Sequence, residues 1–214
     1  MLQTATVEKA TYELLKKLMK DPFLSDFLLA GGTNLALQIG HRTSIDLDLF
    51  SYKSFDAQAL EKHLNQNYNF VPLRVFDVDT VLGYIDGVKV DIVAHIYPLL
   101  NSPLIDDEIR FYSLQDIACM KLVAISDSGT RLKDFVDIAF LSTKMSLIEM
   151  LLCYQKKYDR PNFYHAAKGL SYFGDINFDT SIDLINGKFN WKKIEKRILQ
   201  MIKYENKIFE DLPV

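Results

Sequence analysis

Two aspartates, Asp46 and Asp48, stand two residues apart in a stretch that alternates apolar and polar side chains from Ser44 to Phe50. On a β-strand, residues i and i+2 face the same way with Cα atoms roughly 6.6 Å apart, so the two carboxylates would leave one sheet face and repel each other. A cation between them would remove that repulsion, and Mg²⁺ favours carboxylates together with substrate phosphates. The spacing therefore predicts a Mg²⁺ site, with Mn²⁺ as an alternative ion; the other interpretation is a solvated sheet face.

A third carboxylate, Asp91, stands on a later predicted strand from Val88 to His95, where it points away from the apolar side chains of that strand. If the two strands are neighbours in the sheet, Asp91 would join Asp46 and Asp48 in one site. Such a site can hold two metal ions roughly 4 Å apart, one activating an attacking hydroxyl and one stabilising the leaving phosphate. The predicted chemistry is nucleotidyl transfer, with Asp91 as the third metal ligand or as the base for the acceptor hydroxyl.

A glycine turn, Gly31-Gly32-Thr33, follows a short apolar run from Phe27 to Ala30 and opens a predicted helix that Gly40 ends. Glycines let backbone amides approach a triphosphate at the positively polarised start of a helix, and Thr33 can cap that helix. A glycine turn alone is common in proteins without nucleotide sites. Followed by the acidic pair, however, it predicts that Gly31, Gly32 and Thr33 hold the triphosphate.

Arg42 lies between the turn and the acidic pair, next to His41. We expect both to contact phosphate or the acceptor, or Arg42 to orient an aspartate, since arginine commonly does so beside carboxylates. None of the four histidines falls in a HExxH or similar metal-binding spacing.

Lys121 is placed among apolar residues on a predicted helix, with neighbours Ile117, Ala118, Ala124 and Ile125. A lysine that faces inward needs an anion. Its ammonium could meet a nucleotide phosphate, or the side chain could extend to solvent or to a structural carboxylate.

Arg131, Asp134 and Asp137 follow at i, i+3 and i+6 on the next predicted helix, so consecutive members are neighbours. By spacing alone they could form an ordinary surface charge network.

The predicted secondary structure that must position these residues changes along the chain. From Asp21 to about Leu100, short β-like runs alternate with turn residues, and after Ser113 the pattern is helical. We therefore predict an α/β lobe over residues 1–105 and a helical lobe over residues 106–214. The expected α/β elements are helices from Thr6 to Lys20 and Asp56 to Asn65, strands from Phe70 to Val78 and Thr80 to Ile85, and a hairpin turn at Asp86-Gly87.

Composition limits the function classes. The 214 residues are 49% hydrophobic with net charge −3, which supports a large core and excludes a polycationic nucleic-acid coat. The two cysteines, Cys119 and Cys153, fit reduced thiols in a cytoplasm, and no signal peptide or membrane span is expected. The lysine-rich stretch from Trp191 to Lys207 predicts an amphipathic helix whose basic face is solvated or follows an RNA backbone.

The segment AGGTNLALQIGHRTSIDLDLF, Ala30 to Phe50, resembles the glycine-turn helix and acidic strand of the polymerase-β-like nucleotidyltransferases. More closely, it is similar to the AbiEii/AbiGii toxin family, as is KLVAISDSGTRLKDFVDI, Lys121 to Ile138, which looks like that family's second signature. SYFGD, Ser171 to Asp175, resembles a weaker downstream element. The similarity spans about Phe27 to Asp175, and Asn34 departs from it where relatives often carry a small or apolar residue.

The resemblance implies a polymerase-β-like mixed sheet with a C-terminal helical lobe. It also implies a nucleotidyltransferase toxin of a toxin-antitoxin or abortive-infection system, with an NTP substrate, a tRNA 3′ end or a protein hydroxyl as acceptor, and a cognate antitoxin. It places Lys121 and Asp134 in the site, with Asp137 beside them at the nucleotide. Two other functions stay open: an antibiotic-type small-molecule nucleotidyltransferase, and a catalytically silent nucleotide-binding adaptor.

Overall fold

The computed structural model describes residues 1–76 and 78–214, which form two compact units, Met1–Ser113 and Leu114–Val214. The division lies later than the expected boundary at residue 105, because two short strands that the sequence pattern does not mark belong to the sheet of the first unit. The predicted fold class, a mixed α/β sheet with a helical C-terminal part, is confirmed.

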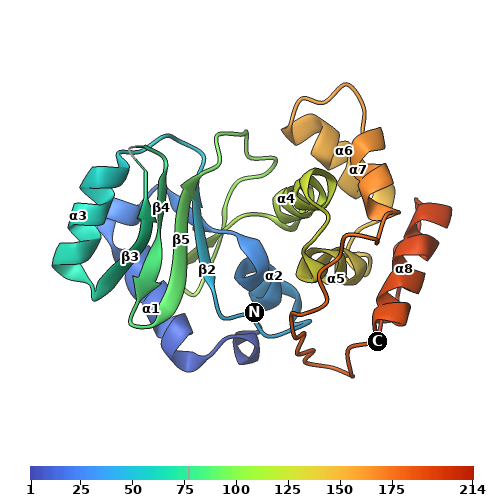
Figure 1. Cartoon of the computed structure of the whole chain (residues 1–214), viewed down its shortest axis with the longest axis horizontal. Helices are drawn as coiled ribbons and strands as arrows, with labels where there is room; N and C mark the ends of the chain where they lie inside the picture. Colours follow the sequence, from blue (N-terminus) through green and yellow to red (C-terminus); the bar gives the residue numbers. More distant parts are fainter. Residues whose placement is uncertain (77) are drawn as a thin grey trace. The chain divides into compact units, whose positions relative to one another are not determined.

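The first unit is built on a seven-stranded sheet in the order β3-β4-β5-β2-β1-β7-β6 (Figure 1). Two neighbouring pairs, β2 with β5 and β1 with β7, run parallel, and the others run antiparallel. The strands are β1 (Phe27–Leu29), β2 (Leu47–Ser51), β3 (Phe70–Val75), β4 (Thr80–Ile85), β5 (Val88–Ala94), β6 (Leu104–Asp106) and β7 (Ile109–Phe111).

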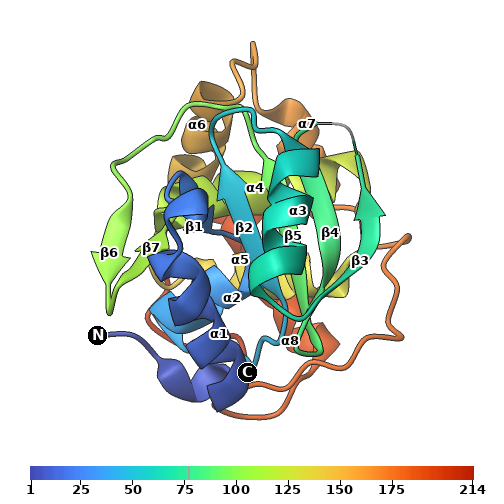
Figure 2. The same cartoon turned by 90° about the vertical axis from the view of Figure 1, so that its left-hand side faces the viewer.

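The hydrophobic core of this unit lies on one sheet face, which α1 and α3 cover (Figure 2). Leu47 and Leu49 of β2 and Val90 and Ile92 of β5 point into it and are almost fully buried. The residues between them must therefore point to the opposite face. The helical segments of the unit are η1 (Thr4–Thr6), α1 (Lys9–Lys20), η2 (Pro22–Leu24), α2 (Gly31–Ile39) and α3 (Ala57–Asn67).

The acidic strand begins later than the predicted Ser44 to Phe50, because the backbone before Leu47 makes other hydrogen bonds. The Ser44 amide donates to the Thr6 carbonyl at 2.9 Å, and the Thr33 hydroxyl donates to the Asp46 carbonyl. Ile45, an apolar residue of the predicted alternation, is 56% exposed and not part of the core.

Other predicted boundaries also shift. The first helix begins at Lys9 rather than Thr6. The predicted strand from Phe70 to Val78 ends at Val75, and it includes residue 77, which lies outside the described residues.

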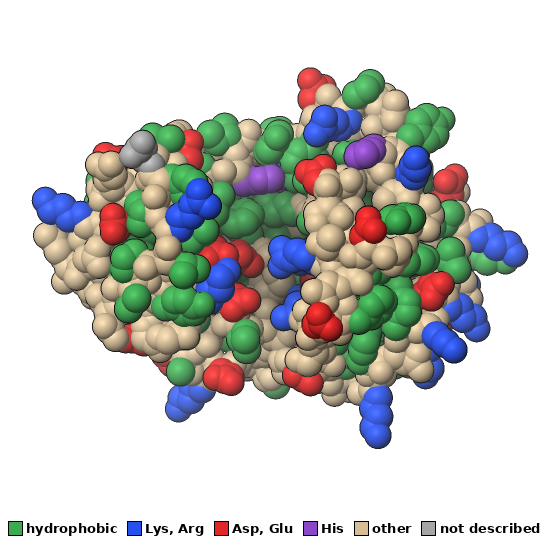
Figure 3. Space-filling view, in the orientation of Figure 1, with side chains coloured by type: hydrophobic (Ala, Val, Ile, Leu, Met, Phe, Trp, Pro, Cys, Tyr) green, Lys and Arg blue, Asp and Glu red, His purple; other side chains and the backbone are tan. Residues whose placement is uncertain are grey.

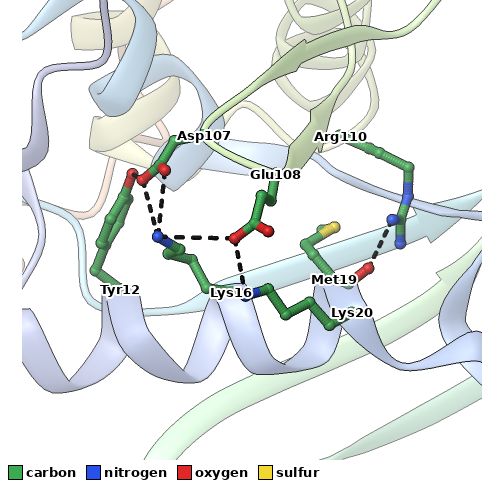
Figure 4. Close-up of polar contacts among 7 residues, drawn as sticks. All are labelled: Tyr12, Lys16, Met19, Lys20, Asp107, Glu108 and Arg110. Carbon is green, nitrogen blue, oxygen red and sulfur yellow. Dashed lines mark hydrogen bonds and ion pairs between the residues drawn. The ribbon is translucent and has the colours of Figure 1, made fainter.

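The β6–β7 hairpin is fixed to α1 by charged side chains at its tip (Figure 4). The Asp107 carboxylate accepts from the Tyr12 hydroxyl at 2.7 Å and from the Lys16 ammonium at 3.2 Å, and Glu108 pairs with Lys20 at 2.9 Å. Arg110 of β7 completes the attachment by donating to three backbone carbonyls, those of Met19, Leu24 and Phe27.

Asp21 joins α1, η2 and α3, because its carboxylate accepts from the Phe23 amide and from the side chains of His63 and Tyr68. Burial, the largest single influence, raises the pKa of Asp21, but these hydrogen bonds outweigh it and hold the pKa below its ordinary value of 3.8.

A lowered folded-state pKa of Asp21 stabilises the protein above the unfolded pKa, and that stability is lost as the pH falls through the folded pKa. In urea titrations, Asp21→Asn should therefore have a lower free energy of unfolding than wild type above about pH 4. The difference between the two proteins should become smaller below that pH. A difference that grows in acid would contradict a lowered pKa of Asp21.

The second unit is helical, with α4 (Leu114–Asp127), α5 (Leu132–Leu141), α6 (Leu147–Lys157), α7 (Tyr164–Leu170) and α8 (Trp191–Lys203). Helix α4 packs against α5, α6 and α7, and α8 packs against α5. The expected amphipathic helix is confirmed in α8, where Ile194 and Ile198 are buried. In the part of the chain that the structure describes, no helix combines the length and apolar character needed to cross a bilayer.

Candidate active site

The parallel pairing of β2 and β5 places Asp48 directly beside Asp91, in register, one residue after the buried pair Leu47 and Val90. Because Leu47 and Val90 point into the core, Asp48 and Asp91 lie on the other face of the sheet. Acidic side chains gather over β2 and β5 in the space-filling view, and a basic side chain lies against them (Figure 3). We call Asp46, Asp48 and Asp91 the carboxylate trio.

Lys89 of β5 lies within the trio. It stands two residues before Asp91 on the same strand face, and its ammonium forms an ion pair with the Asp91 carboxylate. Partial burial, the largest influence, lowers the pKa of Lys89, but Asp91, then Asp46 and Asp48, outweigh it and leave the pKa above its ordinary value. The ammonium therefore lies in the field of all three carboxylates.

The donor set fits a divalent cation. The Asp91 Oδ1 atom is buried and accepts no hydrogen bond from the described residues. A buried carboxylate oxygen of this kind is stabilised by a bound cation. Across residues 1–76 and 78–214, no three His, Cys, Asp or Glu side chains form a ready-made metal shell. In this arrangement the other oxygen of Asp91 is bound by the Lys89 ammonium.

The glycine turn lies against the carboxylate of Asp48. Gly31 has φ +64°, and a Cβ built on it would stand 1.8 Å from Asp48 Oδ2, so only glycine permits this approach. The Ala30 amide donates to the Asp48 carbonyl at 2.8 Å, which fixes the start of α2 beside β2. The first amides of a helix have no acceptor within it, so the turn can offer N–H groups to an anion beside Asp48.

Thr33 does not cap α2, as the sequence had suggested; the helix begins at Gly31, with Ala30 as its N-cap. The fully buried Thr33 hydroxyl donates to the Asp46 carbonyl and lies 2.9 Å from the Ser44 hydroxyl. Its hydroxyl therefore positions Asp46, and only its backbone amide is left for the predicted contact with phosphate.

Arg42 packs against the same glycine turn. Its side chain is almost fully buried and donates to the Thr43 carbonyl at 3.0 Å, and a Cβ on Gly32 would meet its guanidinium at 2.4 Å. This placement favours the structural interpretation of Arg42; a contact with nucleotide stays a prediction.

Gly31→Ala should lower nucleotidyl transfer by about 100-fold, because moving a reacting group by roughly 1 Å has that effect and the new Cβ must displace Asp48. Gly87→Ala is the matched control, since Gly87 also has positive φ but a Cβ there meets nothing within 4 Å. Both variants carry about 1 kcal/mol of backbone strain, measurable by urea unfolding. Equal transfer rates in the two variants would show that the Asp48 contact is unimportant.

In the second unit, Lys121 of α4 lies between two aspartates of α5. Its ammonium is 2.6 Å from Asp134 Oδ1 and 2.7 Å from Asp137 Oδ2, and all three side chains are buried. Arg131, 69% exposed, reaches Asp134 Oδ2 only at 3.7 Å. The Lys121 ammonium is thus paired with two buried carboxylates of α5, and a role of these residues at the nucleotide stays a prediction. Asp134 and Asp137 are not part of a surface network.

Sequence reasoning missed Lys89, although the signal was present in the i, i+2 rule that selected Asp46 and Asp48. It also missed that the Thr33 side chain binds the Asp46 backbone, for which no local pattern exists.

The sequence model of the family described as "Nucleotidyl transferase AbiEii toxin, Type IV TA system" matches residues 13–207 of this chain. The chain belongs to the AbiEii family. The resemblance noted in the sequence is thereby confirmed, and the protein is a nucleotidyltransferase by family.

The chain is also similar to individual proteins. An uncharacterized protein of Aquifex aeolicus (strain VF5) is 32% identical over 203 residues, covering 92% of this chain and 96% of the relative. The crystal structure of JHP933 from Helicobacter pylori has a TM-score of 0.55 at 18% identity, covering 94% of this chain and 93% of JHP933. A second H. pylori structure, of a protein described as a candidate nucleotidyltransferase, also has a TM-score of 0.55 at 18% identity, covering 93% and 96%. At these identities the structures show a shared fold.

Proposed function

We propose that this AbiEii protein transfers a nucleoside monophosphate from an NTP to an acceptor hydroxyl in a Mg²⁺-dependent reaction, and that it acts as the toxin of a toxin-antitoxin pair. The acceptor is a tRNA 3′ end or a protein. The observation that carries the proposal is the register of Asp48 and Asp91 on adjacent parallel strands, beside a glycine turn that leaves no room for a Cβ.

Each residue has a role in this proposal. Asp46 and Asp48 would hold the divalent ion, and Asp91 would serve as the third ligand or as the base for the acceptor hydroxyl. Bound Mg²⁺ would supply charge neutralisation and a more acidic acceptor hydroxyl. The backbone amides of the Gly31–Thr33 turn would bind the triphosphate and orient it for in-line attack.

The helical unit also has a part in the proposal. Lys121 would neutralise phosphate charge, with Asp134 and Asp137 holding its ammonium in place until substrate binds. The basic residues Lys192, Lys193 and Lys196 of α8 would bind the phosphates of an RNA acceptor. A cognate antitoxin would inhibit the toxin.

Incubation of the full chain with α-³²P-labelled NTPs, Mg²⁺, total tRNA and cell protein tests the proposal. The α-phosphorus label should appear on RNA or on protein, disappear with EDTA, and return with added Mg²⁺ or Mn²⁺. The γ-labelled NTP is the matched control, because nucleotidyl transfer releases that phosphate in pyrophosphate. Transfer of the γ-label, or no transfer to any acceptor, would contradict the proposal.

The same assay separates the alternatives. Label in a small acid-soluble product would indicate an antibiotic-type enzyme. Nucleotide binding that survives Asp46→Asn, with no turnover in wild type, would indicate a silent adaptor. Growth arrest on expression of this protein, relieved by co-expressing a cognate antitoxin, would support the toxin-antitoxin assignment.

A further inference from the structure

The Lys89 ammonium places a positive charge among the three carboxylates of the trio. Asp46 comes directly before β2, and Lys89 comes directly before Val90, the partner of Leu47 on β5. Asp46 is close enough to Lys89 to raise the pKa of its ammonium. Three acids and one lysine therefore gather at this end of β2 and β5. The lysine pairs with Asp91, whose other oxygen is buried without a hydrogen bond from the described residues.

The charges of this group do not match a site for two divalent ions. Three carboxylates and one ammonium sum to −2, which one divalent ion neutralises. A second divalent ion would have to share Asp91 with a like-charged ammonium, and such a contact in a partly buried site is strongly repulsive. The Lys89 side chain is 36% exposed and that of Asp91 20%, so the lysine has room to swing into solvent while the aspartate stays in place.

We propose that Lys89 is a built-in counter-cation that competes with a divalent metal ion for Asp91. In the metal-free protein its ammonium holds the carboxylate trio together, and Asp91 becomes a metal ligand only when that ammonium leaves it. Lys89 is thus a positioning residue that limits how tightly the protein holds metal before substrate arrives. This inference rests on the proposed function, because it requires that the trio bind a divalent ion.

Mn²⁺ binding to the full chain without nucleotide, followed by the electron paramagnetic resonance signal of free Mn²⁺, tests the inference. Lys89→Gln removes the charge but keeps a hydrogen-bond donor for Asp91, and it should bind Mn²⁺ roughly tenfold more tightly than wild type. Lys89→Arg keeps the charge and should stay within about threefold of wild type. Lys62→Met, a change of an exposed lysine on α3, is the matched control and should leave the affinity unchanged.

A second readout keeps the test valid if Lys89→Gln is unstable. The metal-free variant should melt below wild type, because three carboxylates then repel without a counter-cation, and added Mn²⁺ should raise its Tm by more than it raises that of wild type.

Two failures can be told apart. If wild type and Lys89→Gln bind Mn²⁺ equally, or the variant binds more weakly, Lys89 does not compete with metal and only this inference is overturned. If neither protein binds Mn²⁺, the metal site of the proposed function is overturned together with it.

Discussion

Asp48→Asn is expected to lower the rate of nucleotidyl transfer by about 10²–10³-fold while leaving the protein folded. Asparagine has nearly the same shape but no charge, so it cannot neutralise a divalent ion, and losing one electrostatic contact to the transition state typically has an effect of about 10²–10³-fold. Asp48 is the best position for this test, because its carboxylate faces both Asp91 and the Gly31 turn. The measurement is the initial rate of α-label incorporation at saturating NTP and Mg²⁺.

Asp86→Asn is the control for that result. Asp86 lies in the β4–β5 turn with φ +50°, a conformation that asparagine adopts readily, so the same chemical change should leave both rate and stability near wild type. If Asp48→Asn kept its rate within about tenfold of wild type, the carboxylate could not be a metal ligand in the reaction.

Lys157→Met is expected to destabilise the protein by about 3–5 kcal/mol, the effect of leaving one partner of a buried ion pair uncompensated. The Lys157 ammonium of α6 is 2.7 Å from Asp116 Oδ1 of α4, and both side chains are completely buried. Methionine fills nearly the same volume, so the loss reports the charge rather than a cavity. Urea denaturation should show a lower midpoint, and thermal unfolding a Tm lower by roughly 10 °C.

Two further variants show whether that loss comes from the pair. Lys156→Met changes the exposed neighbouring lysine and should alter stability by no more than about 0.5 kcal/mol. Asp116→Leu combined with Lys157→Met removes both charges and should recover most of the lost stability. A double variant as unstable as the sum of the two single variants would show that the side chains act through other contacts.

The elements that carry the site were largely predictable, because their pattern is local. Alternation along β2 and β5 assigned Asp48 and Asp91 to the same kind of sheet face, and Gly40 ended α2 as expected. The register that places the two aspartates side by side was not predictable, since α3, β3 and β4 lie between the strands and the pairing depends on how these pack. Strands β6 and β7, of three residues each, are too short to show any periodicity.

Within the candidate site, the sequence predicted the environment of a residue better than the residues that it contacts. The apolar neighbours of Lys121 correctly predicted burial, but only the folded helices show that its ammonium meets Asp134 and Asp137. Thr33 satisfied the rule for a helix cap, yet the Asp46 carbonyl offered its hydroxyl a buried partner from another segment. Such competition among contacts distant in sequence is decided by tertiary packing.

Crystals of the full chain soaked with Mn²⁺ and a non-hydrolysable NTP analogue test the central claim, that the carboxylate trio binds divalent metal beside the glycine turn. Anomalous diffraction should place Mn²⁺ between the carboxylates of Asp46 and Asp48, with the triphosphate against the amides of Gly31–Thr33. Nucleotide bound with no anomalous peak at Asp46 and Asp48, or with its metal held by other side chains, would contradict the account.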